Sequence, residues 1–194
     1  MKTLVLDTTH KYLIIGCLED DTYLSSVSEL AWKRQSERFF PALEECMNKA
    51  GWQSEDIQQV VVTTGPGSYT GERIAMTFAK VFCTQAHVDL YTLSTFLIYA
   101  GQKDCMVMLD ARSNRAYCGI CKDGKLMKEN IKTLDEIRKM ENIEFVGDTE
   151  LIEKESQDLD FIQNIIDVRS SWEKVDNVHT LTPHYLKSKE ELVQ

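Results

Sequence analysis

Alternating or unbroken runs of hydrophobic residues mark the first third of the chain as strand-rich. Such runs over residues 3–8, 11–18 and about 22–30 predict three consecutive strands. Only Thr9 and His10 need lie between the first two, so we expect a tight antiparallel hairpin. The stretch QQVVVTT at 58–64 and a segment near 88–92 predict two more strands.

Helical spacing appears in two longer segments between these strands. Ser36 is a plausible N-cap for a helix that runs over 36–50 and is closed by Gly51. A second helix is predicted over 72–86, and a short one near 94–101. The apolar stripe of the first helix consists of Phe39, Leu43, Cys46, Met47 and Ala50. The stripe of the second consists of Ile74, Phe78, Val81 and Phe82.

The second half begins again with strands. DCMVMLDAR and NRAYCGICK predict a hairpin, and a further strand is expected over 125–131. Thr133 and Glu136 have the spacing of a capping box that starts a helix to about Met140, and NIEFVGD predicts a short strand. Short helices and loops are expected over 149–176, followed by a mostly polar tail. This order favours an α/β fold with a mixed sheet in each of two lobes, residues 1–102 and 103–194.

Composition and charge restrict the classes of function. The chain has 194 residues, of which 43% are hydrophobic and 27% charged, as in globular proteins with a buried core. Its formal charge is −9, with 8 basic and 12 acidic residues in positions 1–100 against 14 and 19 in positions 101–194. Neither half is basic, so the chain is not expected to bind nucleic acid unaided.

The first residues, MKTLVLDTTHKYLIIGCL, do not resemble a signal peptide, and no apolar run approaches the roughly 20 residues that span a bilayer. We therefore expect a cytoplasmic protein whose six cysteines are reduced. Cys118 and Cys121 form a C-x-x-C pair, but on a strand residues three apart point to opposite faces. No second pair is present to complete a zinc site.

The glycine-rich stretch GPGSYTG at 65–71 lies between a strand and a helix, where phosphate groups often bind. Its spacing misses both the Walker and the Rossmann patterns, and Glu72 stands where the Walker lysine would be. The alternative is a tight connection in which Ser68 or Thr70 caps the helix. The candidate phosphate-binding residues are Gly65, Gly67, Ser68, Thr70 and Gly71, together with Asp7 from the first strand.

Asp7 is followed by Thr8 and Thr9, which are compatible with a magnesium–phosphate site or with a turn that holds no ligand. No two histidines have metal-ligand spacing on a helix, and no G-x-S-x-G elbow is present. We predict no catalytic set, no cofactor and no metal.

Apolar residues outside the two helical stripes suggest a surface for a partner. Phe40 and Trp32 flank the first stripe, and Met76 adds to the second. Core packing is the ordinary role of such residues, but an excess over one stripe leaves an exposed patch that suits another helix pair.

Several segments together resemble the TsaB (YeaZ-like) family. They are LVLDTT and LIIGCL at the start, QSERFFPALEECMNKAG, GPGSYTGERIAMTFAKVF, LDARSNRAYCGI, FVGD and TPHYLK. The GPGSYTG-x-R loop with its following helix is the most specific of these. The resemblance covers most of the chain and is weaker over 149–176.

The resemblance implies a two-lobed fold of the actin and Hsp70 type (ASKHA) with a reduced second lobe. It also implies a non-catalytic accessory subunit of the machinery that installs threonylcarbamoyl on the adenosine beside the anticodon of tRNA. The implied partners are a TsaD-like catalytic subunit and a TsaE-like ATPase subunit, with tRNA contacted only through the complex. The partner interface would fall on helices 36–50 and 72–86 and include Phe39, Phe40, Leu43, Met47, Ile74, Met76 and Phe78.

Two residues depart from the family pattern: Gln35 replaces a frequent histidine, and Glu72 replaces a hydrophobic residue. The second departure weakens phosphate binding by the loop.

A homodimer through the same helices is an alternative when the partner is absent. A small ATPase or phosphotransferase of the same fold, acting alone, is the second hypothesis for the function.

Overall fold

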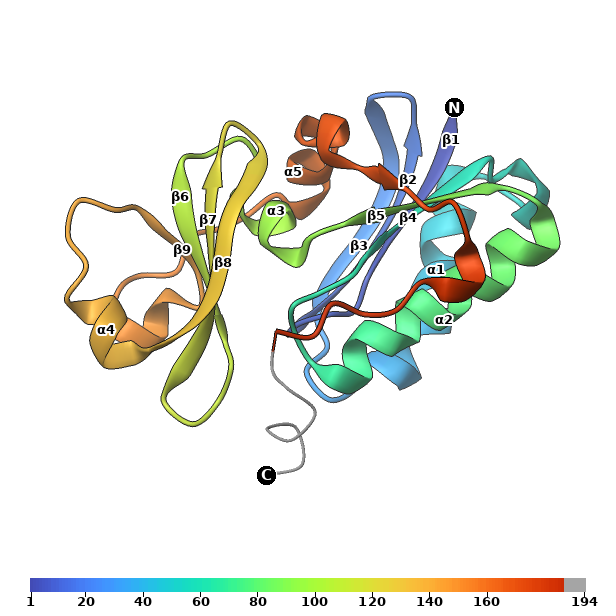
Figure 1. Cartoon of the computed structure of the whole chain (residues 1–194). Coiled ribbons are helices and arrows are strands. Elements are labelled where there is room, and N and C mark those ends of the chain that lie inside the picture. Colours follow the sequence, from blue (N-terminus) through green and yellow to red (C-terminus); the bar gives the residue numbers. More distant parts are fainter. Residues whose placement is uncertain (187–194) are drawn as a thin grey trace.

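Two mixed sheets lie side by side, with helices between and outside them, in the computed structural model of residues 1–186 (Figure 1). The first sheet contains β1 (Lys2–Asp7), β2 (Tyr12–Glu19), β3 (Thr22–Leu30), β4 (Gln59–Thr63), β5 (Asp89–Leu93) and β10 (Glu173–Lys174). The second contains β6 (Cys105–Asp110), β7 (Arg115–Lys122), β8 (Lys125–Thr133) and β9 (Phe145–Gly147). The α-helices are α1 (Gln35–Ala50), α2 (Tyr69–Ala86), α3 (Thr95–Ala100), α4 (Leu134–Arg138) and α5 (Phe161–Asp167). Single 3₁₀ turns are η1 (Ser54–Asp56), η2 (Thr149–Ile152), η3 (Arg169–Ser171) and η4 (Val178–Thr180).

The strand order confirms the predicted fold class. The first sheet has the order β10-β5-β4-β1-β2-β3, in which β1, β2 and β3 pair antiparallel while β1, β4 and β5 pair parallel. The second sheet has the order β8-β7-β6-β9, with β6 and β9 parallel. The protein is therefore a two-lobed α/β fold with a mixed sheet in each lobe, and its second lobe is the smaller one.

Alternation of side chains along the strands assigns the helices to layers. Leu4, Leu6 and Ile15 on one face of the first sheet pack against α1 and α2. Val5 and Ile14 on the opposite face pack against α3 and α5. The same helices also contact one face of the second sheet, whose other face packs against α4. The order of layers is thus α1 and α2, first sheet, α3 and α5, second sheet, α4 (Figure 1).

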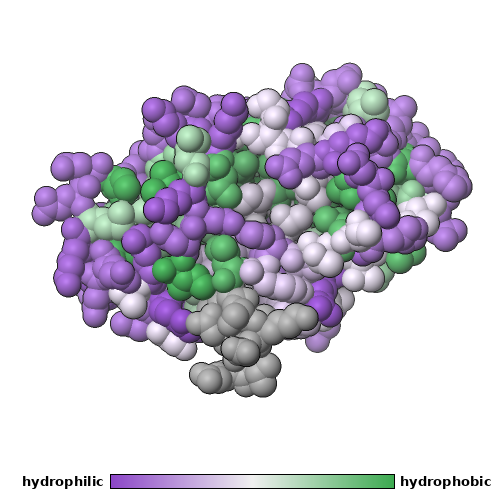
Figure 2. Space-filling model, viewed as in Figure 1, coloured by the Kyte–Doolittle hydropathy of each residue, from purple (hydrophilic) through white to green (hydrophobic). Residues whose placement is uncertain are grey.

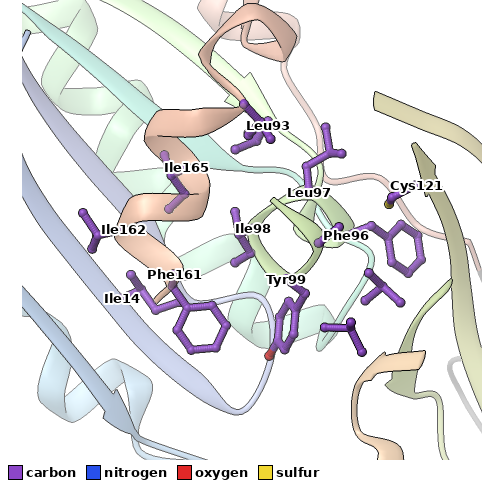
Figure 3. Packing of buried hydrophobic residues seen from close by; sticks show 14 of the residues in the cluster. Ile14, Leu93, Phe96, Leu97, Ile98, Tyr99, Cys121, Phe161, Ile162 and Ile165 are labelled. Carbon is purple, nitrogen blue, oxygen red and sulfur yellow. The ribbon is translucent and has the colours of Figure 1, made fainter. Parts of the chain in front are cut away.

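The short helix α3 lies at the centre of the molecule, and all its residues are buried. Figure 3 shows Phe96, Ile98 and Tyr99 of α3 pointing into a cluster that includes Phe161 of α5. The Tyr99 and Phe161 rings meet edge to face with centroids 5.1 Å apart. A six-residue helix has little stability of its own, so this packing on both sides is what stabilises α3.

Element boundaries differ from the predicted ones at several places, three of which bear on the site. Ser36 does not cap α1, because the helix already begins at Gln35 after Arg34, which makes no side-chain cap bond. The turn between β1 and β2 spans residues 8–11 rather than two residues. Helix α2 begins at Tyr69, three residues earlier than expected, with Ser68 as its N-cap. The capping box of Thr133 and Glu136 is confirmed at the start of α4.

The chain after the second sheet returns to the first. Strand β10 pairs antiparallel with β5, and the backbone N–H of His184 donates to the carbonyl of Thr64 at 2.7 Å. Strand β10 was not predicted, since only short helices and loops were expected over 149–176. Its two residues are too few to show an alternation of apolar and polar positions. The lobe boundary at residue 102 stays a prediction. Residues 187–194, the end of the predicted polar tail, lie outside the described part of the chain.

Candidate functional site

The GPGSYTG loop packs directly on the turn between β1 and β2. The Thr8 hydroxyl donates to the Gly71 carbonyl at 2.6 Å, and the Ser68 N–H donates to the Thr9 carbonyl at 2.6 Å. A methyl group at Gly67 would lie 1.9 Å from the Thr9 carbonyl oxygen, and one at Gly71 would lie 2.2 Å from the Thr8 carbonyl oxygen. These two glycines are therefore required by close backbone contact. This contact explains the glycines without a ligand, and phosphate binding by the loop stays a prediction.

Asp7 is buried at the end of β1 and is held within its own turn. Its Oδ1 accepts hydrogen bonds from the Thr9 N–H at 3.0 Å, from the Thr9 hydroxyl at 2.6 Å and from the Thr63 hydroxyl. Burial raises the pKa of Asp7 above its ordinary value, against the opposing effect of these hydrogen bonds. The arrangement is the Asx-type turn that the sequence offered as one of two interpretations.

Glu72 is 1% exposed, so it does not present a negative charge at the loop as the sequence had suggested. Burial raises the pKa of its carboxyl to about 8, and the charge of Asp7 adds to this effect while a hydrogen bond from the Gly67 backbone opposes it. Within residues 1–186 its Oε2 atom is buried and has no hydrogen-bond partner. Near neutral pH this carboxyl is therefore mostly protonated, because placing a charge there costs desolvation energy.

We expect the Glu72→Gln variant to lose part of the pH dependence of folding stability. The pKa of Glu72 is higher in the folded state than in the unfolded state. Its contribution to the free energy of unfolding is therefore complete below the unfolded-state pKa of about 4.5, and it is lost as the pH rises through about 8. The wild-type free energy of unfolding should fall by roughly 3 kcal/mol more than that of the variant between pH 5 and pH 9. Urea unfolding at both pH values measures this difference.

The matched control is Glu37→Gln, a change of the same kind at an exposed position in the first turn of α1. Its pH dependence should follow that of the wild type. Equal pH dependence of the wild type and Glu72→Gln would show that Glu72 is ionised in the folded protein.

Ion pairs connect the turn after β1 to the second lobe. His10 Nε2 lies 2.6 Å from Asp148 Oδ2, and Lys11 Nζ lies 2.6 Å from Asp148 Oδ1. The backbone N–H of Asp110 also donates to Asp148 Oδ2, at 2.7 Å. Burial alone would raise the pKa of Asp148, but the partners His10 and Lys11 hold it well below its usual range. The turn thus contacts the glycine-rich loop on one side and the second lobe on the other.

An apolar groove of about 570 Å³ lies on the outer side of α1 and α2. We call it the helix groove. Its lining is Ser36, Phe39, Phe40, Tyr69, Thr70, Arg73, Ile74, Thr77, Phe78 and Val81. The rings of Phe39, Phe40 and Phe78 meet edge to face with centroids 5.3 to 6.0 Å apart. Phe40 is 63% exposed and Val81 60%, which is unusual for large apolar side chains on paired helices.

The predicted interface residues divide into two groups. Phe39, Leu43 and Met76 are buried in the core, although Phe39 also forms the floor of the helix groove. The remaining ones, Phe40, Met47, Ile74 and Phe78, keep exposed surface. Contact with a partner stays a prediction for the whole set.

The stripe chosen on α2 by periodicity is the outer one. Ile74, Phe78 and Val81 line the helix groove, whereas Ala75, Ala79 and Cys83 face the sheet. Small side chains let α2 approach the sheet closely, so the larger ones are left outside. Met76, expected beyond the stripe, packs in the core.

Sequence reasoning missed several residues of these sites. Tyr69 and Arg73 line the helix groove, with the Arg73 guanidinium 4.3 Å from the Tyr69 ring centroid. Asp148 is the last residue of the predicted strand segment NIEFVGD and gave no signal of its own, because its partners His10 and Lys11 lie far away along the chain. The sequence did hold one signal for Tyr69. Ser68 has a side chain that can cap a helix, and a helix capped by Ser68 begins at Tyr69, as α2 does.

The cysteines behave as the sequence predicted. All are buried free thiols, and Cys118 and Cys121 of β7 belong to the clusters on opposite faces of the second sheet. Among residues 1–186, no group of three or more His, Cys, Asp or Glu side chains is arranged to hold a metal ion. No helix in the described part of the chain is long and apolar enough to cross a bilayer.

A second cavity, of about 440 Å³, lies between the lobes. Its lining combines leucines with Thr64, Ser94, Ser170 and Lys125. Figure 2 shows the face viewed in Figure 1, on which hydrophilic side chains cover the outer edges of both lobes and hydrophobic ones appear among them.

Known proteins match this chain over most of its length. The family model described as "TsaD: tRNA N6-adenosine threonylcarbamoyltransferase" matches residues 25–183. The tRNA threonylcarbamoyladenosine biosynthesis protein TsaB of Bacillus subtilis is 30% identical over 125 residues, which is 62% of this chain and 55% of that protein. TsaB of Buchnera aphidicola is 24% identical over 178 residues, covering 84% and 79% of the two chains.

The solved structure of YeaZ from Pseudomonas aeruginosa superimposes with a TM-score of 0.73 at 18% identity, over 95% of this chain and 99% of that one. The structural likeness shows a shared fold, and the family model shows the relationship in sequence. The chain belongs to the TsaD family in the broad sense and, within it, to the TsaB (YeaZ-like) family of tRNA threonylcarbamoyladenosine biosynthesis proteins.

Proposed function

We propose that this chain is a non-catalytic subunit that binds and supports a TsaD-like catalytic subunit during threonylcarbamoyladenosine formation in tRNA. The observation that carries the proposal is the helix groove, whose exposed aromatic residues have no partner within residues 1–186 that covers them. The names of the TsaB relatives support the pathway. The groove supports a role in assembly.

The chemistry of the helix groove suits another helical surface. Its walls are two helices, and its lining is apolar apart from hydroxyl groups and Arg73 at the rim. Large apolar patches with a polar rim mark protein interfaces, and aromatic anchors in such patches contribute most of the binding energy. A helix pair of the partner, laid against α1 and α2, would cover Phe40, Ile74 and Phe78 together.

The remaining partners follow from charge and from the family. A formal charge of −9 opposes direct contact with tRNA, so we propose that the catalytic subunit holds the tRNA. A TsaE-like ATPase subunit is proposed as a further member of the complex. In the absence of the catalytic subunit, two copies of this chain would cover the same groove in a homodimer.

A reconstitution assay tests the proposal. The chain, the catalytic subunit and the ATPase subunit of the same organism are purified and supplied with threonylcarbamoyl-adenylate and tRNA, singly and in combination. Modified adenosine should form only when the catalytic subunit is present, and should form faster when this chain is added. Modification by this chain alone would contradict the non-catalytic role.

The cavity between the lobes keeps a second candidate open, a small ATPase or phosphotransferase of the same fold. Its volume and its single lysine are the observations in favour. Calorimetry with Mg–ATP tests it, because that function requires measurable heat and saturable binding by the chain alone. Absence of binding at millimolar nucleotide would remove this candidate.

A further inference from the structure

A third cavity, of about 260 Å³, opens directly beside the helix groove. We call it the cationic pocket. It shares Ser36, Thr70 and Ile74 with the groove, so the two hollows form one continuous surface. Its other walls come from the segment before α1, from the glycine-rich loop and, through Arg112, from the second lobe.

The charge of this pocket is opposite to that of the protein. Lys33 and Arg112 line it and no carboxylate does, although the chain as a whole carries −9. Among residues 1–186 neither cation forms an ion pair with a carboxylate. The Arg112 guanidinium lies 6.0 Å from the centroid of the Trp32 ring, which holds it at the pocket.

The polar groups of the wall complete a site for an anion. The hydroxyls of Ser36, Ser68 and Thr70 all line the pocket and can donate hydrogen bonds. Gln35 also lines the pocket, is more than nine-tenths buried and is oriented by a hydrogen bond of 2.7 Å from its Nε2 to the His10 carbonyl. A volume of about 260 Å³ accommodates one side chain rather than a helix.

We propose that the cationic pocket receives an aspartate or glutamate side chain of the protein that fills the helix groove. This inference rests on the proposed function, because it describes the partner of that same surface. Continuity of the two hollows argues for one occupant. A nucleic acid is disfavoured, since two cations on a protein of net charge −9 offer too small a basic surface for a phosphate backbone. The partner helix thus carries a carboxylate next to its apolar anchors.

The test is the affinity for the purified TsaD-like subunit of the same organism. Lys33→Glu and Arg112→Glu should each raise the dissociation constant about tenfold at low salt, because like charges then face each other across the interface. The neutral variants Lys33→Gln and Arg112→Gln should have smaller effects. Raising the salt concentration should narrow the difference between wild type and variants. Urea unfolding verifies that each variant is folded.

Lys139→Glu is the control, since it makes the same change of charge at an exposed position just after α4, in the other lobe. It should leave the dissociation constant within about twofold of the wild type.

If Lys33→Glu and Arg112→Glu bind like this control while Phe40→Asp does not bind, the inference is wrong and the proposed function stands. If the wild type itself does not bind the TsaD-like subunit, the proposed function is wrong, and the inference that rests on it is wrong as well. Loss of tRNA binding by the charge variants with unchanged subunit binding would assign the pocket to phosphate and overturn the inference.

Discussion

Replacing Phe40 with aspartate is expected to weaken binding to the TsaD-like catalytic subunit at least about 100-fold. The side chain is 63% exposed and stands in the helix groove against Phe39 and Phe78, where an anchor residue of the interface would be. A carboxylate at this position would lose its hydration among apolar side chains in the complex, which adds to the loss of apolar contact. Calorimetric titration of the two purified subunits measures the effect.

The same variant should remain folded, because little of Phe40 is buried within the chain. We expect its free energy of unfolding to lie within about 1 kcal/mol of the wild-type value. Any homodimer of the isolated chain should dissociate as well, which sedimentation measures. Met127→Asp is the matched control, since Met127 is also 63% exposed but lies on β8 of the other lobe. If both variants bind the catalytic subunit like the wild type, the helix groove is not the interface.

Replacing Gly67 with alanine is expected to lower the free energy of unfolding by about 3 kcal/mol or more. The added methyl group would lie 1.9 Å from the Thr9 carbonyl oxygen, so the glycine-rich loop and the turn after β1 must separate. That separation breaks the hydrogen bond from the Ser68 N–H to Thr9 and disturbs the turn that carries His10 and Lys11 to Asp148. Urea unfolding with circular dichroism measures the loss.

Gly51→Ala provides the comparison. Gly51 has φ +70° and no heavy atom within 4 Å of an added methyl group, so only backbone strain of about 1 kcal/mol is expected. A loss at Gly67 no greater than the loss at Gly51 would show that the loop can move away from the turn without cost. The phosphate interpretation predicts something different, namely that Gly67→Ala changes ligand affinity more than stability.

Local pattern was sufficient for most of the fold. Strands β1, β4 and β6 each contain a short apolar run bounded by polar residues. Such a run is the sequence pattern of a buried strand, so these three strands could be predicted. The capping box at Thr133 marked α4 because cap chemistry acts within four residues. Strand β10 was missed, since two residues paired with β5 from 81 and 83 positions away leave no periodic trace.

The candidate site was predictable only in part. Periodicity located apolar stripes on α1 and α2, but it cannot say whether a stripe faces the sheet or the solvent. On α2 the stripe faces outward, because the sheet accepts Ala75 and Ala79 at close distance and leaves Ile74 and Phe78 outside. Arg112 reaches the cationic pocket from the second lobe, and no local signal could indicate that.

The sequence by itself determined the two-lobed α/β class and the glycine-built loop between strand and helix, because the pattern of strands, helices and turns depends on neighbours within a few residues. Only the tertiary structure decided the protonation of Glu72, the outward face of α2 and the pairing of His10 with Asp148. Each of these depends on burial or on contacts between distant segments. Burial removes water from a carboxyl, close packing sorts side chains by size, and neither effect can be read from the order of residues alone.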